Sequence, residues 1–510
     1  MSWDVIVIGT GIGGLTAAAA LARRGKRVLM LEQHVRPGGQ TQTIRRGRWT
    51  FATGVHYIGG VADSPGPEGQ FKRLLDWLAG EPLEFAPSAN PYDIVRLPGF
   101  EFGITHPEAA FREALVARFP DEAAAIHDWF ADCEQARRGA MTAFQLHGMP
   151  RLLAAGLRLW RGREATRWAT RTVAEALERF RDPRLRAVLG ARWGDYGAPP
   201  ARAPLAEHAL VTGSYNDGAF YPVGGPARFA QAIVPTVRAA GGELRTGARV
   251  RRILVQDDHV CGVVYEHAGA PVEEHARHVV SAIGVANTMD CLGNGHAARW
   301  RETVEGLAPG IGYISLFLGL EGDIAAAGAS SANQWVFESE DIGQVWTDPA
   351  GTNAPGLFVS FPSLKDPASP PDAPTAEVIA IVDPRPFARW LDDREAVTDD
   401  DYRALKATIE TRMLAQFDRH FPALAPLRRF HELATPVTQR HYIGAAGGAM
   451  YGVEMSAERL TSPALHVKTP LPGLFLAGQD VTSPGIQGAA MGGLMAAAAI
   501  EPTLWRQFAG

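Results

Sequence analysis

The stretch DVIVIGTGIGG, residues 4–14, decides the fold class of this 510-residue chain. Its first half is a β-branched run typical of a strand buried on both faces, and its second half matches the spacing G-x-G-x-x-G. Gly9 permits the tight turn, Gly11 lets the backbone approach a pyrophosphate, and Gly14 lets helix and strand pack closely. An alanine-rich helix over 15–24 and a strand over 27–31 follow. This order of elements predicts a Rossmann-like dinucleotide-binding unit.

An acidic residue and a second glycine turn extend the motif. Glu32 lies 18 residues after Gly14, where a carboxylate accepts hydrogen bonds from ribose hydroxyls and repels the 2′-phosphate of an NADP-type adenosine. Gly38 and Gly39 then allow a further close backbone approach. The alternative, a glycine-rich loop without a ligand, leaves the ordered strand, turn, helix, strand and acid unexplained. The predicted cofactor residues of this segment are Gly9, Gly11, Ile12, Gly13, Gly14, Glu32, Gln33, Gly38, Gly39, Gln40 and Thr41.

The spacing of the two glycine turns resembles the extended dinucleotide motif of the flavoproteins that include glutathione-reductase-like and amine-oxidase-like enzymes. This resemblance favours FAD over NAD as the cofactor. In those flavoproteins the residue that matches Val250 contacts adenine through its backbone. Val250 is the last residue of a predicted strand and turn over 242–250.

A second candidate cofactor segment lies near the end of the sequence. Residues 474–477 form an apolar strand, Gly478 and Asp480 follow it, and a helix rich in alanine and glycine extends from about 487 to 500. Asp480 is placed to accept hydrogen bonds from ribityl or ribose hydroxyls. The free N–H groups of Gln487, Gly488 and Ala489 are placed to face the flavin and to stabilise negative charge on it. The alternative is an ordinary buried helix packed through small residues.

The predicted architecture is therefore an α/β fold with a Rossmann-like FAD-binding domain of the glutathione-reductase and amine-oxidase type and a discontinuous α+β substrate domain. The FAD-binding domain is expected to comprise residues 1–60, 220–300 and 465–510. The substrate domain is expected to comprise residues 61–219 and 301–464.

Three further segments carry a more specific resemblance. They are Thr53-Gly54-Val55-His56-Tyr57-Ile58-Gly59, Gly218-Ala219-Phe220-Tyr221-Pro222-Val223-Gly224-Gly225 and Leu476-Ala477-Gly478-Gln479-Asp480-Val481. With them the sequence resembles the retinol saturase branch of the carotenoid isomerase and phytoene desaturase family. The resemblance implies flavin-linked saturation, desaturation or isomerisation of a carbon–carbon double bond in a hydrophobic retinoid-like or carotenoid-like polyene.

Such chemistry needs one proton donor or acceptor beside the flavin. His56 and Tyr57 are the candidates nearest the expected flavin position, and Tyr442 and Tyr451 are second choices. The alternative for His56 is a histidine that only hydrogen-bonds the cofactor or the backbone. No second G-x-G-x-x-G follows a strand, so a separate nicotinamide domain is not expected and the electron donor or acceptor is left open.

Composition excludes other classes of function. The net charge of −5 gives no reason to expect a nucleic-acid partner. Three widely spaced cysteines, and fifteen histidines without ligand spacing, predict neither a disulfide framework nor a metal site. We expect a cytoplasmic protein with no signal peptide and no spanning helix.

Residues 151–180 raise the question of a membrane surface. Several arginines alternate there with leucines and tryptophans, a pattern of interfacial anchors, so peripheral membrane contact is one interpretation and a solvated substrate-domain helix is the other. Two alternative functions also stay open: an amine-oxidase-like flavoenzyme, and a non-catalytic protein that binds flavin and polyene.

Overall fold

The structure is a computed structural model that describes residues 3–64, 66, 69–148, 167–393 and 395–508. Its first sheet has seven strands: β1 (Trp3–Ile8), β2 (Val28–Leu31), β9 (Glu243–Arg245), β10 (Arg249–Gln256), β11 (His259–His267), β12 (Ala270–Ser281) and β18 (Leu474–Leu476). Their order is β10-β11-β12-β1-β2-β9, with β18 paired to β12. β1 runs parallel to both β2 and β12, as expected of a Rossmann-like sheet.

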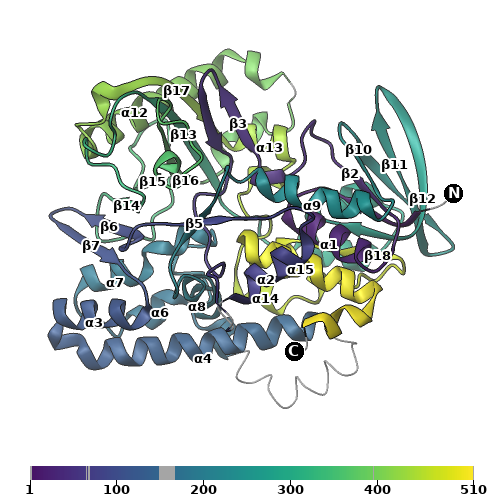
Figure 1. Cartoon of the computed structure of the whole chain (residues 1–510), viewed down its shortest axis with the longest axis horizontal. Helices are drawn as coiled ribbons and strands as arrows, with labels where there is room; N and C mark the ends of the chain where they lie inside the picture. The colour runs from purple at the N-terminus through teal and green to yellow at the C-terminus, as the bar shows by residue number, and fades with distance from the viewer. Residues whose placement is uncertain (1–2, 65, 67–68, 149–166, 394, 509–510) are drawn as a thin grey trace.

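Small residues bring the two ends of the chain together on this sheet. Helix α1 (Ile12–Ala22) is buried along its whole length and packs against α15 (Gly485–Ile500). A Cβ on Gly493 of α15 would come within 2.1 Å of the Gly13 carbonyl oxygen, so the two helices approach at backbone distance. In Figure 1 the purple α1 and the yellow α15 lie side by side.

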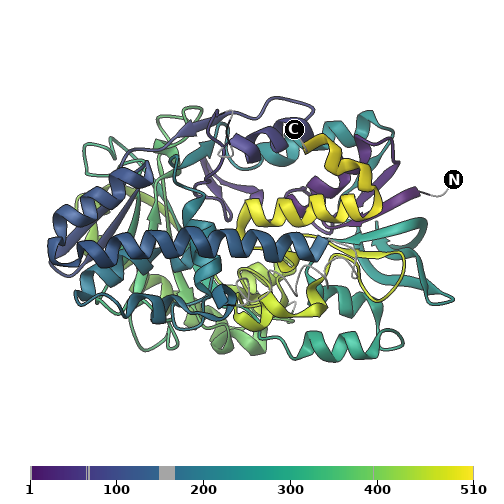
Figure 2. The ribbon, with the colours of Figure 1, turned by 90° about the horizontal axis from the view of Figure 1, so that it is seen from below.

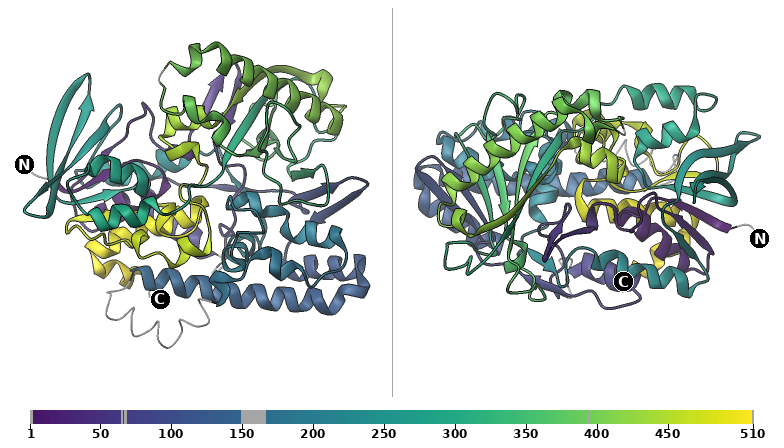
Figure 3. Two further views of the ribbon diagram at one scale, coloured as in Figure 1. Left: turned by 180° about the vertical axis from the view of Figure 1, so that it is seen from behind. Right: turned by 90° about the horizontal axis from the view of Figure 1, so that it is seen from above.

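The second sheet also has seven strands, in the order β17-β13-β16-β15-β14-β6-β7. They are β6 (Asp93–Leu97), β7 (Phe100–Ile104), β13 (Gly312–Leu320), β14 (Asn333–Phe337), β15 (Gly356–Ser360), β16 (Thr375–Val382) and β17 (Arg428–Ala434). One face packs its alternate residues against α12 (Asp400–His420) in a common apolar core. The other face is turned toward the interior of the molecule, where the candidate site lies. The two views of Figure 3 show this sheet beside the first one.

Helices complete both parts. Those around the second sheet are α3 (Glu108–Arg118), α4 (Ala123–Gly148), α6 (Val173–Leu177), α7 (Pro183–Gly190) and α8 (Leu205–Gly213), and α4 runs along one side of the molecule (Figure 2). The others are α2 (Gln70–Leu78), α9 (Arg228–Ala239), α10 (Val285–Leu292), α11 (Ala298–Glu305), α13 (Pro436–Ile443) and α14 (Ala457–Thr461). Two short two-stranded sheets complete the fold: the hairpin of β3 (Thr43–Arg46) with β4 (Trp49–Ala52), and the antiparallel pair of β5 (Phe85–Pro87) with β8 (Phe220–Pro222).

The predicted fold class is confirmed, but packing does not follow the predicted domain limits at two places. Helix α2 falls within the limits of the substrate domain, yet its apolar face packs into the core of the first sheet. The β3–β4 hairpin falls within the limits of the FAD-binding domain, yet the ring of Phe51 packs 5.3 Å from that of Phe317 in the second sheet. Each of these segments therefore buries its apolar side against the sheet of the other predicted domain.

The described structure also bears on the segment 151–180. Residues 151–166 lie outside the described part of the chain. Trp168, one of the apolar residues expected of a surface anchor, is buried in the core beside α4 and α8. Arg171 pairs with Asp132, as does Arg179. Residues 167–180 therefore do not present the predicted apolar face. Among the described residues, no helix has both the length and the apolar composition needed to cross a bilayer.

Candidate active site

A cavity of about 2270 Å³ extends between the two sheets and is lined by both parts of the chain. Pockets for single small ligands usually measure roughly 300–1,000 Å³. The cavity therefore has room for a dinucleotide together with a second long molecule. Its walls contain nearly all of the predicted site residues, from Gly9 in the first strand–helix turn to Ala489 in α15.

The turn between β1 and α1 has the geometry of a phosphate cradle. Gly9 has φ +88°, a conformation that favours glycine, and a Cβ on Gly14 would lie 2.1 Å from the Gly9 carbonyl oxygen. Gly11 differs, because a Cβ built there would meet no atom within 4 Å. Its missing side chain leaves free space inside the cavity at the start of α1, where unpaired N–H groups and the helix dipole favour an anion. The residues present therefore fit a dinucleotide.

Glu32 organises this cradle from the end of β2. Its buried carboxylate accepts hydrogen bonds from the backbone N–H of Thr10 (3.0 Å), from the Thr10 hydroxyl and from the His34 N–H (2.8 Å). The Thr10 hydroxyl in turn accepts one from the Gly38 N–H at 3.2 Å. Thr10, which occupies a variable position of the glycine motif, thus joins the two glycine turns. The predicted contact of Glu32 with ribose remains a prediction.

The second glycine turn lies directly against the first. Gly38 and Gly39 both have positive φ, and a Cβ on Gly39 would lie 3.0 Å from the Gly11 Cα. The Thr41 hydroxyl donates to the Gly38 carbonyl at 2.8 Å, and Gln40 Nε2 donates to the Met450 carbonyl at 3.2 Å. The remaining predicted residues of this end, Ile12, Gly13, Gln33 and Val250, also line the cavity.

Asp480 holds two loops of the cavity wall. Its Oδ2 accepts from the Val285 N–H at 2.8 Å and its Oδ1 from the Val453 N–H at 3.2 Å. Each carboxylate oxygen keeps a second lone pair, so the predicted bond to a ribityl or ribose hydroxyl is compatible with these contacts. The buried guanidinium of Arg459, which donates to the carbonyls of Val453, Gln479 and Thr482, fixes the same loops.

The start of α15 contains glycines of two kinds. Gly488 is required by packing, because a Cβ there would lie 1.9 Å from the Ser483 carbonyl oxygen. Gly478 and Gly485 line the cavity, and a Cβ at either position would meet no atom within 4 Å. Gln487 Nε2 donates to the Gly59 carbonyl at 2.6 Å and joins α15 to the segment that carries His56. Gly485 was not predicted, although the Pro-Gly pair before the helix was a sequence signal for it.

His56 lies in the cavity wall and is held from behind by the second sheet. Its Nδ1 lies 2.7 Å from Glu377 Oε2, in a close contact that is not aligned as a hydrogen bond. Its backbone carbonyl accepts from Lys365 Nζ at 2.8 Å. Its ring is 5.5 Å from that of Phe358. Neither Glu377 nor Lys365 was predicted.

Tyr57 joins two buried carboxyls. Its hydroxyl donates to Asp195 Oδ2 at 2.7 Å and lies 3.4 Å from Asp93 Oδ2. Burial raises the pKa of Tyr57 well above its ordinary value, and the two nearby carboxyls add to this effect. Its ring stacks on Tyr215 at 4.6 Å. The Tyr57 hydroxyl is therefore a hydrogen-bond donor to Asp195 in this structure.

Asp195 and Lys365 are two buried groups near His56 and Tyr57 whose pKa falls near neutrality, as does that of the buried carboxyl of Glu207. Burial, reinforced by the like charge of Asp93, raises the pKa of Asp195 to about 7, against the lowering effects of the Tyr57 hydrogen bond and of Arg192. Burial lowers the pKa of Lys365 to about 7, against the raising effects of Asp93 and Glu377. Asp195 lines the cavity, whereas Lys365 lies behind its wall.

The two second-choice tyrosines lie in different environments. Tyr451 lines the cavity, and a Cβ on Gly197 would lie 2.5 Å from its ring. Burial raises the pKa of Tyr451, which makes it a poor proton donor. Tyr442 is 50% exposed, and its ring packs edge-on against His34 and His441. Since His34 follows Glu32, Tyr442 lies on the nucleotide side. Among its described contacts none is to His56, so the structure does not bring these two candidates together.

The second sheet supplies an apolar wall. Trp335, Phe358 and Ile379 are directly opposite one another on β14, β15 and β16. Since strand residues two apart share a face, Phe337, Ile381 and Tyr313 extend the same wall. The rings of Trp335 and Phe358 pack edge-on at 4.8 Å. A long apolar molecule in this part of the cavity would contact hydrocarbon along its length.

Comparison with known proteins agrees with this geometry. The family model described as NAD(P)-binding Rossmann-like domain matches residues 7–76, from β1 through most of α2. The structure of cyclohexylamine oxidase from Brevibacterium oxydans IH-35A superposes with a TM-score of 0.60 at 19% identity and covers 100% of both chains. This likeness shows the fold.

Relatives of known name match along nearly the whole chain. All-trans-retinol 13,14-reductase of Macaca fascicularis is 31% identical over 523 residues, which cover 98% of this chain and 85% of that protein. The chloroplastic prolycopene isomerase of Daucus carota is 23% identical and covers 97% of this chain and 79% of its own. These matches confirm the predicted resemblance to the retinol saturase branch of the carotenoid isomerase and phytoene desaturase family. With that identity over that share of both sequences, the chain belongs to the all-trans-retinol 13,14-reductase family.

Proposed function

We propose that this protein is an FAD-dependent oxidoreductase that acts on a carbon–carbon double bond of a hydrophobic polyene. One observation carries the proposal: a single cavity joins the glycine-lined cradle of the first sheet to the apolar wall of the second, with His56 in the wall between them. The family relationship to proteins named for a retinol and for a carotenoid supports the same substrate class.

The residues of the cradle would hold FAD. Gly11 and the first turn of α1 would receive the pyrophosphate, Glu32 the adenosine ribose, and Asp480 a hydroxyl of the ribityl chain. The first turn of α15 would face the isoalloxazine with its free N–H groups. When bound, the flavin supplies or accepts a hydride at one carbon of the double bond.

The protein itself would orient the substrate, exclude water from the cavity and provide a proton. Trp335, Phe358 and Ile379 would hold the polyene flat against the second sheet and exclude water. His56 would exchange the proton at the other carbon. The same parts serve saturation, desaturation and isomerisation, which differ in electron supply and in the position of the substrate.

Anaerobic mixing tests the proposal. The purified holoenzyme, oxidised or reduced with dithionite, is mixed with all-trans-retinol, with prolycopene and with saturated analogues, while flavin absorbance and products are followed. We expect a polyene to re-oxidise the reduced flavin, or to be desaturated by the oxidised flavin, or to be isomerised. Binding of polyene with no change in flavin or product would instead identify a carrier.

One feature favours a second candidate. Tyr57, Tyr215 and Tyr451 surround the cavity carboxyl of Asp195, an arrangement that also suits the cation of an amine. An amine-oxidase-like enzyme would release hydrogen peroxide from primary or secondary amines in air. A panel of amines assayed with peroxidase separates the two functions, and we expect no peroxide above the rate without amine.

A further inference from the structure

A row of four polar residues crosses the second sheet directly behind His56 and Tyr57. Asp93, Asn333, Ser360 and Glu377 lie on the adjacent strands β6, β14, β15 and β16, and each is 0% exposed. Asn333 is opposite Asp93, and Ser360 is opposite Glu377. On β14, β15 and β16 the polar residue lies two positions from Trp335, Phe358 and Ile379 of the apolar wall. Residues two apart on a strand share a face, so these polar side chains are on the cavity face of the sheet. We call these four residues the polar row.

Lys365 covers the polar row and connects it to His56. Its Nζ donates to Asn333 Oδ1, to the Ser360 hydroxyl at 2.7 Å and to the His56 carbonyl at 2.8 Å. All three ammonium protons are thus used. Asn333 Nδ2 donates a hydrogen bond to Asp93 Oδ1 at 2.9 Å, which extends the network to β6. The backbone of His56 therefore has a fixed position relative to the sheet.

Glu377 holds the ring of the same residue. Its Oε1 accepts from the Ala52 N–H at 2.6 Å, which leaves Oε2 for His56 Nδ1 at 2.7 Å. Nδ1 is completely buried, whereas the His56 side chain as a whole is 11% exposed. The exposed surface therefore belongs to the other atoms of the side chain, which borders the cavity.

The buried charges around His56 show where a proton is needed. Three carboxyls, those of Asp93, Asp195 and Glu377, face two permanent or potential cations, Arg192 and Lys365. Burial of an uncompensated charge is costly, so when Lys365 is protonated one more proton is required for neutrality. His56 and Asp195 are the members of this group that both border the cavity and are able to carry it.

We propose that Glu377 and Lys365 are positioning residues that hold His56 as an imidazolium with Nε2 toward the cavity. This inference rests on the proposed polyene chemistry. In the reducing direction the Nε2–H bond breaks and a C–H bond forms at one alkene carbon, while the reduced flavin gives a hydride to the other carbon. The ring becomes neutral and takes up a proton from water between turnovers.

Several titratable and charged groups set the pH dependence of this step. They come from every element packed around His56 and comprise Glu377, Lys365, Tyr57, Tyr221, Asp93, Asp195 and Arg192. Glu377 is the one whose carboxylate contacts the ring.

Glu377→Gln tests the inference, because the amide oxygen keeps the acceptor for Ala52 while an uncharged NH2 replaces the carboxylate oxygen that faces His56 Nδ1. Dithionite-reduced holoenzyme is mixed with all-trans-retinol in a single turnover, from pH 5 to 9. We expect the rate of flavin re-oxidation to fall about 100-fold. We also expect its decline at high pH to begin at a lower pH, because a neutral amide no longer favours the imidazolium. Half-saturation by retinol and the flavin absorbance spectrum should not change.

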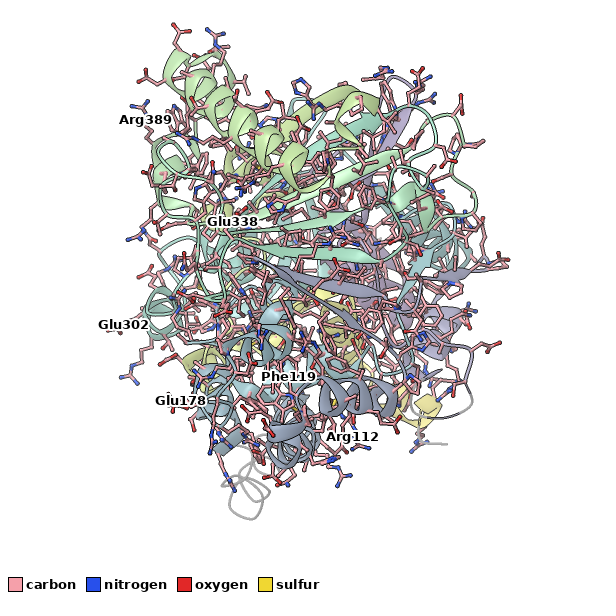
Figure 4. The ribbon with its side chains drawn as sticks, turned by 90° about the vertical axis from the view of Figure 1, so that its left-hand side faces the viewer. Arg112, Phe119, Glu178, Glu302, Glu338 and Arg389 are labelled. Atoms are coloured by element: carbon pink, nitrogen blue, oxygen red, sulfur yellow. The ribbon has the colours of Figure 1, made fainter. Side chains whose placement is uncertain are left out.

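Two controls make the outcome decisive. Glu338→Gln removes the carboxylate of another Glu–His pair, that of Glu338 with His420. Glu338 lies outside the cavity, near the surface seen in Figure 4. This substitution should leave the rate and the pH profile unchanged. The imidazole NMR signal of His56 is identified as the one that disappears in His56→Phe. When that signal is titrated in solution, its midpoint should shift to lower pH in Glu377→Gln, as the rate profile does.

Three results would overturn the inference. One is a wild-type rate and pH profile in Glu377→Gln. Another is a rate lost only together with flavin or retinol binding, which would make Glu377 merely structural. The third is loss of the high-pH decline in Asp195→Asn but not in Glu377→Gln, which would place the proton on Asp195. Failure of the wild-type enzyme to react with any polyene would instead refute the proposed function.

Discussion

Gly11→Ala should separate cofactor binding from folding. Gly11 has φ −58° and ψ 168°, which alanine adopts without strain, and a Cβ there meets no protein atom within 4 Å. The apoprotein should therefore unfold as the wild type does, or be more stable by about 0.4–1 kcal/mol through the lower entropy of its unfolded chain. The added methyl group would, however, occupy the space that we assign to a phosphate of the cofactor.

The loss in affinity follows from the contacts at the start of α1. Displacing the phosphate breaks at least one charge-assisted hydrogen bond, worth about 1.5–3 kcal/mol. At about 1.4 kcal/mol per tenfold change, the Kd for FAD should rise about 10- to 150-fold. Titration of apoprotein with FAD, followed by quenching of flavin fluorescence, measures the Kd, and thermal unfolding of the apoprotein measures stability.

Two other glycines provide the comparison. Gly295→Ala adds a methyl group at an exposed position that is also open to 4 Å, and it should change neither quantity. Gly14→Ala places a Cβ 2.1 Å from the Gly9 carbonyl oxygen and should destabilise the apoprotein itself. Wild-type FAD affinity in Gly11→Ala would show that the cradle is not where the phosphate binds, and a destabilised apoprotein would contradict the free space at this position.

Three further substitutions test the site. His56→Phe should keep flavin bound and lower turnover at least about 100-fold, because the cavity loses its proton donor, and retained turnover would remove His56 from that role. Lys365 has a pKa lowered by burial from 10.5 to about 7, so the unfolded chain binds more protons between these values and the wild-type free energy of unfolding rises with pH there. The rise amounts to up to about 5 kcal/mol, at about 1.4 kcal/mol per pH unit. Urea unfolding of Lys365→Met should not show it. A variant that keeps the rise would contradict its assignment to the lowered pKa of Lys365. Phe358→Ala should raise the KM for polyene about tenfold, from the loss of about 1.5 kcal/mol of apolar contact, with the Kd for FAD unchanged; a change confined to FAD binding would argue against the apolar wall.

The sequence was sufficient to predict the residues that line the glycine-rich half of the cavity. Its signals are local: Gly9, Gly11 and Gly14 fall within six residues, and Glu32 follows at a fixed spacing. Thr10 escaped notice because the motif places no demand on that position, although its hydroxyl joins the two glycine turns.

The substrate half was only partly predictable, because its contacts join distant residues. Glu377 meets Ala52 across 325 positions, and Lys365 meets His56 across 309. A lone glutamate in a strand otherwise rich in valine and alanine gives no sign of its partner until the sheet is assembled. The role of Tyr442 stays a prediction: its ring packs against His34, and no described contact joins it to His56.

The close contact of α1 with α15 has a consequence for biogenesis. The cradle opened by residues 9–14 is completed by residues 478–489, so a nascent chain exposes a half-built nucleotide site throughout most of its synthesis. Contacts that span more than 450 positions form late, because the intervening chain must first be ordered. Flavin loading is thus expected to follow the synthesis and folding of α15. Flavin supply would then govern how much of the newly made protein reaches its mature state.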